Sequence, residues 1–142
     1  DHLQLIIDYG VIGLLLLLSL VACAVAIERW LVFRSTRVTD FADRRELELH
    51  LTNKLHLIAT IGTNAPYIGL LGTVLGIMLT FATIGETGFD TGRIMRGLSM
   101  ALKATALGLL VAIPAVTLYN LLLRRCKVLL LKWDIAHGRE GV

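Results

Sequence analysis

Charged side chains are missing from three long stretches of the sequence. Residues 9–27, 55–85 and 104–123 contain no Asp, Glu, Lys or Arg. Each stretch is long enough to cross about 30 Å of hydrocarbon as a helix. The chain is 56% hydrophobic with a mean hydropathy of +0.74, more apolar than soluble domains usually are. The sequence therefore predicts an all-α membrane protein with three transmembrane helices.

Cysteine is scarce, and the two that are present, Cys23 and Cys126, have no metal-site spacing. We interpret both as packing residues. The four histidines are scattered, and the sequence shows no nucleotide-binding loop and no Ser-His-Asp set. These absences disfavour an enzyme and predict no metal and no other cofactor. The start lacks a basic n-region and an A-x-A-like site, so we expect no cleavable signal peptide.

Basic residues are divided unevenly among the segments outside these stretches. Six lie in residues 28–56 and five in the tail 124–142, against two in the loop 85–96 and none in residues 1–8. The positive-inside rule then places the N-terminus and the loop outside, and segment 28–56 and the tail in the cytoplasm. The expected spans, in one domain covering residues 1–142, are about 9–27, 62–84 and 97–123.

The two basic segments are expected to be cytoplasmic helical extensions. Segment 28–56 contains Arg44 and Glu48 at i, i+4 spacing, and we expect it to run into the second span as one helix. The tail, RRCKVLLLKWDIAH, is expected to continue the third helix. The glycine-rich loop GETGFDTGR predicts a tight turn, which makes the second and third helices an antiparallel hairpin.

Small and hydroxyl residues form one stripe on each of the last two predicted helices, at steps of three and four. The first stripe is Gly62, Pro66, Gly69, Thr73, Gly76, Thr80 and Thr83, and the second is Gly97, Ala101, Thr105, Gly108, Ala112 and Ala115.

Two interpretations of these stripes stay open. Close helix packing would use the glycines, for which we single out Gly69, Gly72, Gly76 and Gly108. A pore lining would use hydroxyls that hold water or relay protons without a buried charge. Three helices are too few to enclose a pathway, so a pore requires an oligomer. The pore candidates are Thr73, Thr80 and Thr105.

Lys103 is the one ionisable residue well inside a predicted span. A lysine at the membrane centre costs about 2.5–3.5 kcal/mol on insertion scales. It therefore either snorkels to the outer surface or contacts a lipid headgroup or a neighbouring subunit. Pro66 and Pro114 each remove a helical hydrogen bond. They are expected to kink their helices, either to open an inner mouth or as a tolerated irregularity.

The runs NAPYIGLLGTVLGIMLTF (residues 64–81) and ALKATALGLLVAIPAVTLYN (residues 101–120) resemble helix signatures of the MotA/TolQ/ExbB proton-channel family. The ERWLVFR end of the first helix fits as well. The resemblance covers nearly the whole chain and is strongest to the ExbB branch, in a compact form, with TolQ second. Thr73 and Thr105 match the pore-facing threonines of the family.

The resemblance implies a ring of subunits, typically a pentamer, in the bacterial inner membrane. The second and third helices would surround a pore that holds an ExbD-like single-span partner with a proton-accepting aspartate. Proton-motive force would then act through a TonB-like protein to energise transport across the outer membrane.

One position departs from this pattern. Many family members carry Glu five positions before the third-helix threonine, where this chain has Met100. A partner carboxylate would have to replace it. Two alternatives stay open: a TolQ-like subunit of an envelope-maintenance motor, and a non-conducting membrane scaffold. A self-sufficient cation channel is disfavoured, since cation pores use acidic rings or carbonyl filters.

Overall fold

The computed structural model describes residues 2–138, which form three long helices and two short ones. The long helices are α1 (His2–Ser35), α3 (Leu55–Thr87) and α4 (Thr91–Ala136). Between α1 and α3 lie a 3-10 turn, η1 (Val38–Asp40), and the short helix α2 (Arg44–Thr52). All three long helices are long and apolar enough to cross a membrane. The predicted fold class, an all-α membrane protein with three spanning helices, is confirmed.

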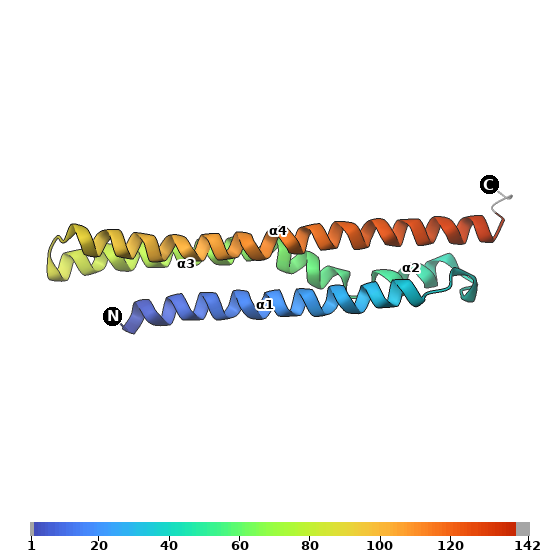
Figure 1. The fold of residues 1–142 in the computed structure, drawn as a ribbon, viewed down its shortest axis with the longest axis horizontal. Coiled ribbons are helices and arrows are strands. Elements are labelled where there is room, and N and C mark those ends of the chain that lie inside the picture. Colours follow the sequence, from blue (N-terminus) through green and yellow to red (C-terminus); the bar gives the residue numbers. More distant parts are fainter. Residues whose placement is uncertain (1, 139–142) are drawn as a thin grey trace.

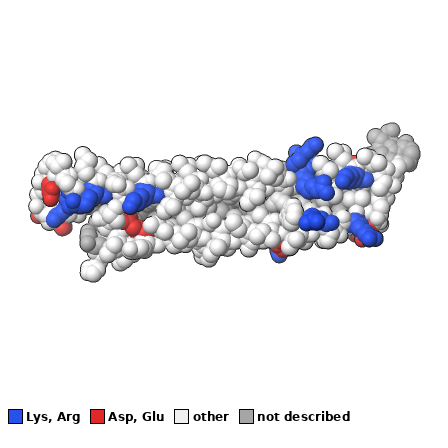
Figure 2. All heavy atoms as spheres, in the orientation of Figure 1, with Lys and Arg blue, Asp and Glu red and all other residues white. Residues whose placement is uncertain are grey.

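The long helices lie side by side and share one long axis (Figure 1). The N-terminus of α1 lies at the same end as the turn between α3 and α4, which we call the turn end. The last turns of α1 and α4 lie at the opposite end together with α2, which we call the α2 end. Lys, Arg, Asp and Glu gather at these two ends and leave the middle of the visible face uncharged (Figure 2). This distribution suits a bundle whose middle lies in hydrocarbon.

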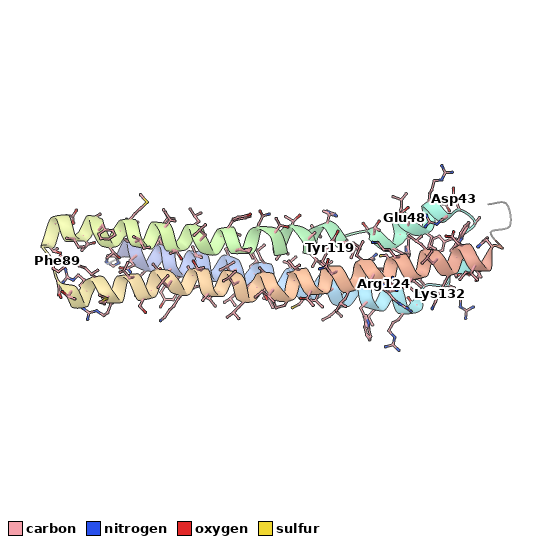
Figure 3. All side chains as sticks on the ribbon, turned by 90° about the horizontal axis from the view of Figure 1, so that it is seen from above. Asp43, Glu48, Phe89, Tyr119, Arg124 and Lys132 are labelled. Carbon is pink, nitrogen blue, oxygen red and sulfur yellow. The ribbon has the colours of Figure 1, made fainter. Side chains whose placement is uncertain are left out.

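Helix ends fall outside the predicted spans. Helices α3 and α4 take up most of the predicted loop 85–96 and leave only residues 88–90 as a turn. Gly88, with φ 89°, ends α3, and the Asp90 side chain caps α4 by accepting a hydrogen bond from the Gly92 N–H at 3.0 Å. Phe89 stands at this turn (Figure 3). The membrane boundaries of the spans stay predictions.

The tail continues its helix as predicted, whereas segment 28–56 does not. Helix α4 runs without interruption to Ala136, as expected, and residues 139–142 of the predicted tail lie outside the described part. The expectation that segment 28–56 joins the second span as one helix is wrong. Lys54 adopts a left-handed backbone conformation with φ 69°, which separates α2 from α3. This conformation interrupts a helix because it turns the chain out of the helical path.

The break lets α2 fold onto α1 and α4. Leu47 and Leu51 of α2 have no exposed surface and pack with Phe33 and Cys126 in the main hydrophobic cluster. Three hydrogen bonds from side chains fix the fold here: Arg29 Nη1 to the His50 carbonyl at 2.8 Å, Trp133 Nε1 to the Phe41 carbonyl at 2.9 Å, and Arg44 Nε to Asp134 at 3.1 Å. The α2 end therefore combines buried apolar side chains with hydrogen bonds that tie α2 and its flanking segment to α1 and α4.

The two cysteines differ in burial. Cys126 is buried, as a packing residue should be, and its Sγ lies 3.6 Å from the Leu51 carbonyl oxygen. Cys23 is exposed on the bundle surface, so its interpretation as a packing residue is wrong for the single chain. It stands on α1 at the edge of a groove between α1 and α4.

Candidate functional site

Helices α3 and α4 touch backbone to backbone where the two predicted stripes meet. A Cβ added to Gly69 would lie 2.5 Å from the Ala104 carbonyl oxygen and 3.1 Å from the Gly108 Cα. A Cβ on Gly108 would lie 2.6 Å from the Ala65 carbonyl oxygen. Only glycine fits at either position without separating the helices, as in other membrane helix pairs with small residues at the contact.

The neighbouring glycines extend this contact toward the turn end. A Cβ on Gly76 would lie 2.9 Å from the Ala101 Cβ. A Cβ on Gly72 would lie 2.8 Å from the Ala104 Cβ and 3.1 Å from the Val11 Cγ1 of α1. Gly72 thus lies where all three long helices meet. The four glycines singled out from the sequence all lie at helix contacts.

Thr73 and Thr105 meet at the centre of this contact. Their hydroxyl groups are hydrogen-bonded to each other across the two helices. The Thr73 Oγ1 also lies 2.8 Å from the Ala101 carbonyl oxygen and 3.3 Å from the Gly69 carbonyl oxygen. Thr105 Oγ1 lies 3.5 Å from the same Gly69 oxygen. Thr73 is 7% exposed, whereas Thr105 is half-buried and reaches the surface of the helix pair.

A hydroxyl group donates one hydrogen bond and accepts others, so it can exchange roles with its neighbour. The two threonines share two protons among two hydroxyl oxygens and two carbonyl oxygens. Rotating both hydroxyls together leaves the pair hydrogen-bonded with the opposite polarity, because each hydroxyl has a carbonyl oxygen as its second acceptor. The pair can therefore pass on the orientation of a hydrogen-bond chain, and no charged group has to be buried.

Thr80 is separate from this pair. Its hydroxyl donates to the Gly76 carbonyl of its own helix at 2.9 Å, and its side chain packs over Gly97 of α4. It is 7% exposed and lines a cavity of about 460 Å³ at the turn end, together with Gln4, Arg93 and other residues. The structure therefore brings together two of the three predicted pore threonines and leaves the third about two helical turns away.

Lys103 is exposed on α4 and lies close enough to Asp8 of α1 to interact with it electrostatically. One oxygen of Asp8, Oδ2, is buried and accepts no hydrogen bond from any described residue. One turn earlier on α1, Gln4 Nε2 approaches the Met100 sulfur at 4.0 Å. The first helix thus brings an amide and a carboxylate to the turn-end half of α4.

Asp8 is the residue that sequence reasoning missed. It directly precedes the first uncharged stretch and lies one helical turn after Gln4. Those features mark a polar face at the start of α1, but a single sequence does not say which helix that face meets. Lys103 was expected to contact a lipid or a neighbouring subunit, and those contacts stay predictions beside this one within the chain.

Pro66 and Pro114 lie within α3 and α4, and both helices continue past them. Pro66 is half-buried, and Pro114 is exposed on the bundle surface. The expected kinks stay predictions.

The shortest ion pair among residues 2–138 lies far from the threonine pair, at the α2 end. Glu28 holds the buried Arg29 with two hydrogen bonds of 2.6 and 2.9 Å, and Lys54 lies 3.5 Å from the same carboxylate. These cations, with Arg29 contributing most, lower the pKa of Glu28 to about 2. Arg29 is 4% exposed and also caps the α2 backbone, so this cluster supports the fold. No group of three His, Cys, Asp or Glu residues within residues 2–138 could hold a metal ion.

Comparison with known proteins finds one family model and several similar proteins. Residues 34–135 match the model of the MotA/TolQ/ExbB proton channel family. A putative biopolymer transport protein ExbB-like 2 of Helicobacter pylori is 59% identical over 132 residues, which cover 92% of this chain and 88% of that protein. The biopolymer transport protein ExbB of Aquifex aeolicus is 55% identical over 139 residues, 97% of this chain and 94% of that protein.

A more distant relative comes from another branch. The Tol-Pal system protein TolQ of Pseudomonas aeruginosa is 40% identical over 102 residues, which cover 70% of this chain but only 42% of that protein. The full-length matches are therefore to compact proteins named for biopolymer transport.

Proposed function

This chain belongs to the MotA/TolQ/ExbB proton channel family, and we propose that it is the ring-forming inner-membrane subunit of an ExbB–ExbD-type motor. In this proposal several copies, as a pentamer, surround an ExbD-like single-span partner. Proton-motive force drives the assembly, no cofactor is needed, and a TonB-like protein carries the output to transport across the outer membrane. The chain itself performs no catalysis.

The observation that carries the proposal is the hydrogen-bonded pair of Thr73 and Thr105. It joins the two helices that surround the pore in this proposal. Thr105 is half-buried in the single chain and retains an open side. We propose that this side faces the ring axis, where it meets water or the partner helix.

Charge distribution supports the need for a partner. Residues 57–85 of α3 and 97–123 of α4 contain no Asp or Glu, and Met100 lies beside Gln4. A proton crossing the bilayer through hydroxyl groups alone would have no carboxylate to accept it. The partner's aspartate would supply that group next to the threonine pair.

Chain coverage favours the ExbB-type assignment over TolQ. The chain spans 94% of the ExbB of Aquifex aeolicus but 42% of the TolQ of Pseudomonas aeruginosa. By the positive-inside rule, the basic segments at the α2 end support an orientation with that end in the cytoplasm and the turn end in the periplasm. This orientation gives three crossings with the N-terminus periplasmic and the C-terminus cytoplasmic.

The test is replacement of Thr73 or Thr105 by Val in cells that depend on the transport system. We expect rings of normal size, measured by native mass spectrometry, together with loss of substrate uptake, because Val keeps the shape and removes the hydroxyl. Thr105→Ser should restore part of the uptake.

Thr117→Val is the matched control, because Thr117 is exposed on α4 and bonds only the Ile113 carbonyl of its own helix. Full uptake by both pair variants would overturn the proposed role. Loss of the rings instead of uptake would favour the alternative of a non-conducting scaffold. A defect in envelope integrity with intact uptake would favour a TolQ-like function.

A further inference from the structure

A groove of about 530 Å³ runs between α1 and α4 on the flank of the bundle, toward the α2 end. Its floor is formed by Ala26, Phe33 and Leu122, none of which is more than 6% exposed. Ile27 and Leu121 stand along its walls and are 59% and 62% exposed. The groove is thus an apolar trough that opens sideways from the helices.

Two arginines line the same groove at its charged end. Arg34 lies in the last turn of α1 and Arg125 lies on α4, just past the third uncharged stretch. The Arg34 guanidinium carbon lies 4.8 Å from the centre of the Trp30 ring, which holds it over the groove wall. Neither arginine forms an ion pair within residues 2–138. Both guanidinium groups are therefore available to an anion.

The combination selects an amphiphile with an anionic head. Guanidinium groups bind phosphate through paired N–H donors, and tryptophan is enriched at the level of lipid headgroups. Basic pockets between membrane helices on the cytoplasmic side are a known place for acidic lipids. An acyl chain would lie along Ile27 and Leu121 in the trough while the head stays at the arginines.

We propose that this groove binds one anionic phospholipid of the surrounding leaflet, with its phosphate between Arg34 and Arg125. The proposal goes beyond the motor function. It uses the orientation given above only to name the cytoplasmic leaflet. A bound lipid of this kind would fill the space between α1 and α4 and couple the outer helix of each subunit to the membrane.

The experiment is native mass spectrometry of the full chain in detergent, titrated with phosphatidylglycerol or phosphatidylcholine. One variant combines Arg34→Gln with Arg125→Gln. The matched control combines Arg124→Gln with Lys127→Gln, which removes the same charge from exposed positions on α4 outside the groove. A third variant, Cys23→Trp, keeps every charge and fills the trough, because Cys23 is exposed and lines it.

We expect the arginine variant to bind phosphatidylglycerol more weakly by a factor on the order of thirty. The variant loses the attraction of two cations for the anionic headgroup. Cys23→Trp should also lose the lipid, the control should retain it, and phosphatidylcholine should bind less well than phosphatidylglycerol. An equal loss in the control would overturn the proposal, because general positive charge would then explain binding. A changed subunit number in the arginine variant, with lipid retention unaltered, would overturn it in favour of a contact between copies.

Discussion

The polar side chains at the contact between α3 and α4 are uncharged hydroxyl groups. The Thr73 and Thr105 hydroxyls bond each other and the carbonyls of Gly69 and Ala101. One stripe of small residues on each of the two helices was visible in the sequence, because a period of three and four marks one helix face. The pairing of Thr73 with Thr105 was not, because it depends on the axial register of two helices. Backbone contact at Gly69 and Gly108 sets that register.

At the residue scale, Glu28 predicts a defined pH dependence. Its pKa is about 2 in the folded chain against an ordinary value of 4.5, because Arg29 and Lys54 favour the ionised form. The stabilisation is therefore complete above about pH 4.5 and is lost as the pH falls toward 2. We expect Glu28→Gln to lower the midpoint of thermal unfolding in detergent at pH 7 and to flatten its fall between pH 5 and 3.

Glu86→Gln, an exposed glutamate near the turn end, is the control and should follow the wild-type profile. Parallel profiles for Glu28→Gln and the wild type would show that Glu28 contributes nothing to this acid sensitivity.

At the scale of elements, α3 and α4 form a hairpin whose contact tolerates no added atoms. Membrane helices lack a hydrophobic drive toward each other, so close approach and van der Waals contact supply the association. Sequence patterns located this hairpin and the continuous α4. They did not locate the break before α3, because Lys54 is neither Gly nor Asn, the residues that usually signal a left-handed helix end. Leu47 and Leu51 fix that break through burial, which only the folded chain reveals.

Gly108→Ala tests the helix pair. The new Cβ would lie 2.6 Å from a backbone oxygen that has no freedom to move aside, so overpacking should cost about 1–3 kcal/mol. Gly13→Ala is the matched control, since a Cβ on Gly13 of α1 meets nothing within 4 Å. It should be neutral or stabilising by up to about 1 kcal/mol. Thermal unfolding of both variants in one detergent measures the difference, and equal midpoints would contradict close packing at Gly108.

At the scale of the whole molecule, the uncharged middle of Figure 2 separates two charged ends. Among the described residues, Asp8 of α1 brings a carboxylate, beside Lys103, to the turn-end half of the three-helix contact. No acidic side chain lies along α3 or α4 between residues 57 and 85 or 97 and 123. A proton path along these parts of α3 and α4 would therefore contain no carboxylate of its own.

Proteoliposomes containing this chain alone should conduct protons no faster than empty vesicles when a pH gradient is imposed. Co-reconstitution with the proposed aspartate-bearing partner should produce a flux, followed with a pH-sensitive dye. Asp8→Asn with the partner present should leave that flux intact if the partner's carboxylate carries the proton. Conduction by the chain alone that disappears in Asp8→Asn would assign the carrier to α1 instead.

Helix α4 has a mechanical consequence that follows from its length. It contains 46 residues without interruption and is about 69 Å long at 1.5 Å per residue, more than twice the thickness of the hydrocarbon. Tyr119, Arg124 and Lys132 follow one another along the half that leaves the apolar zone (Figure 3). That half is a lever, braced by α2 through Arg44 and Trp133. A tilt of about 5° in the membrane would move the α2 end of this half by about 3 Å, so a small rearrangement within the membrane becomes a larger displacement outside it.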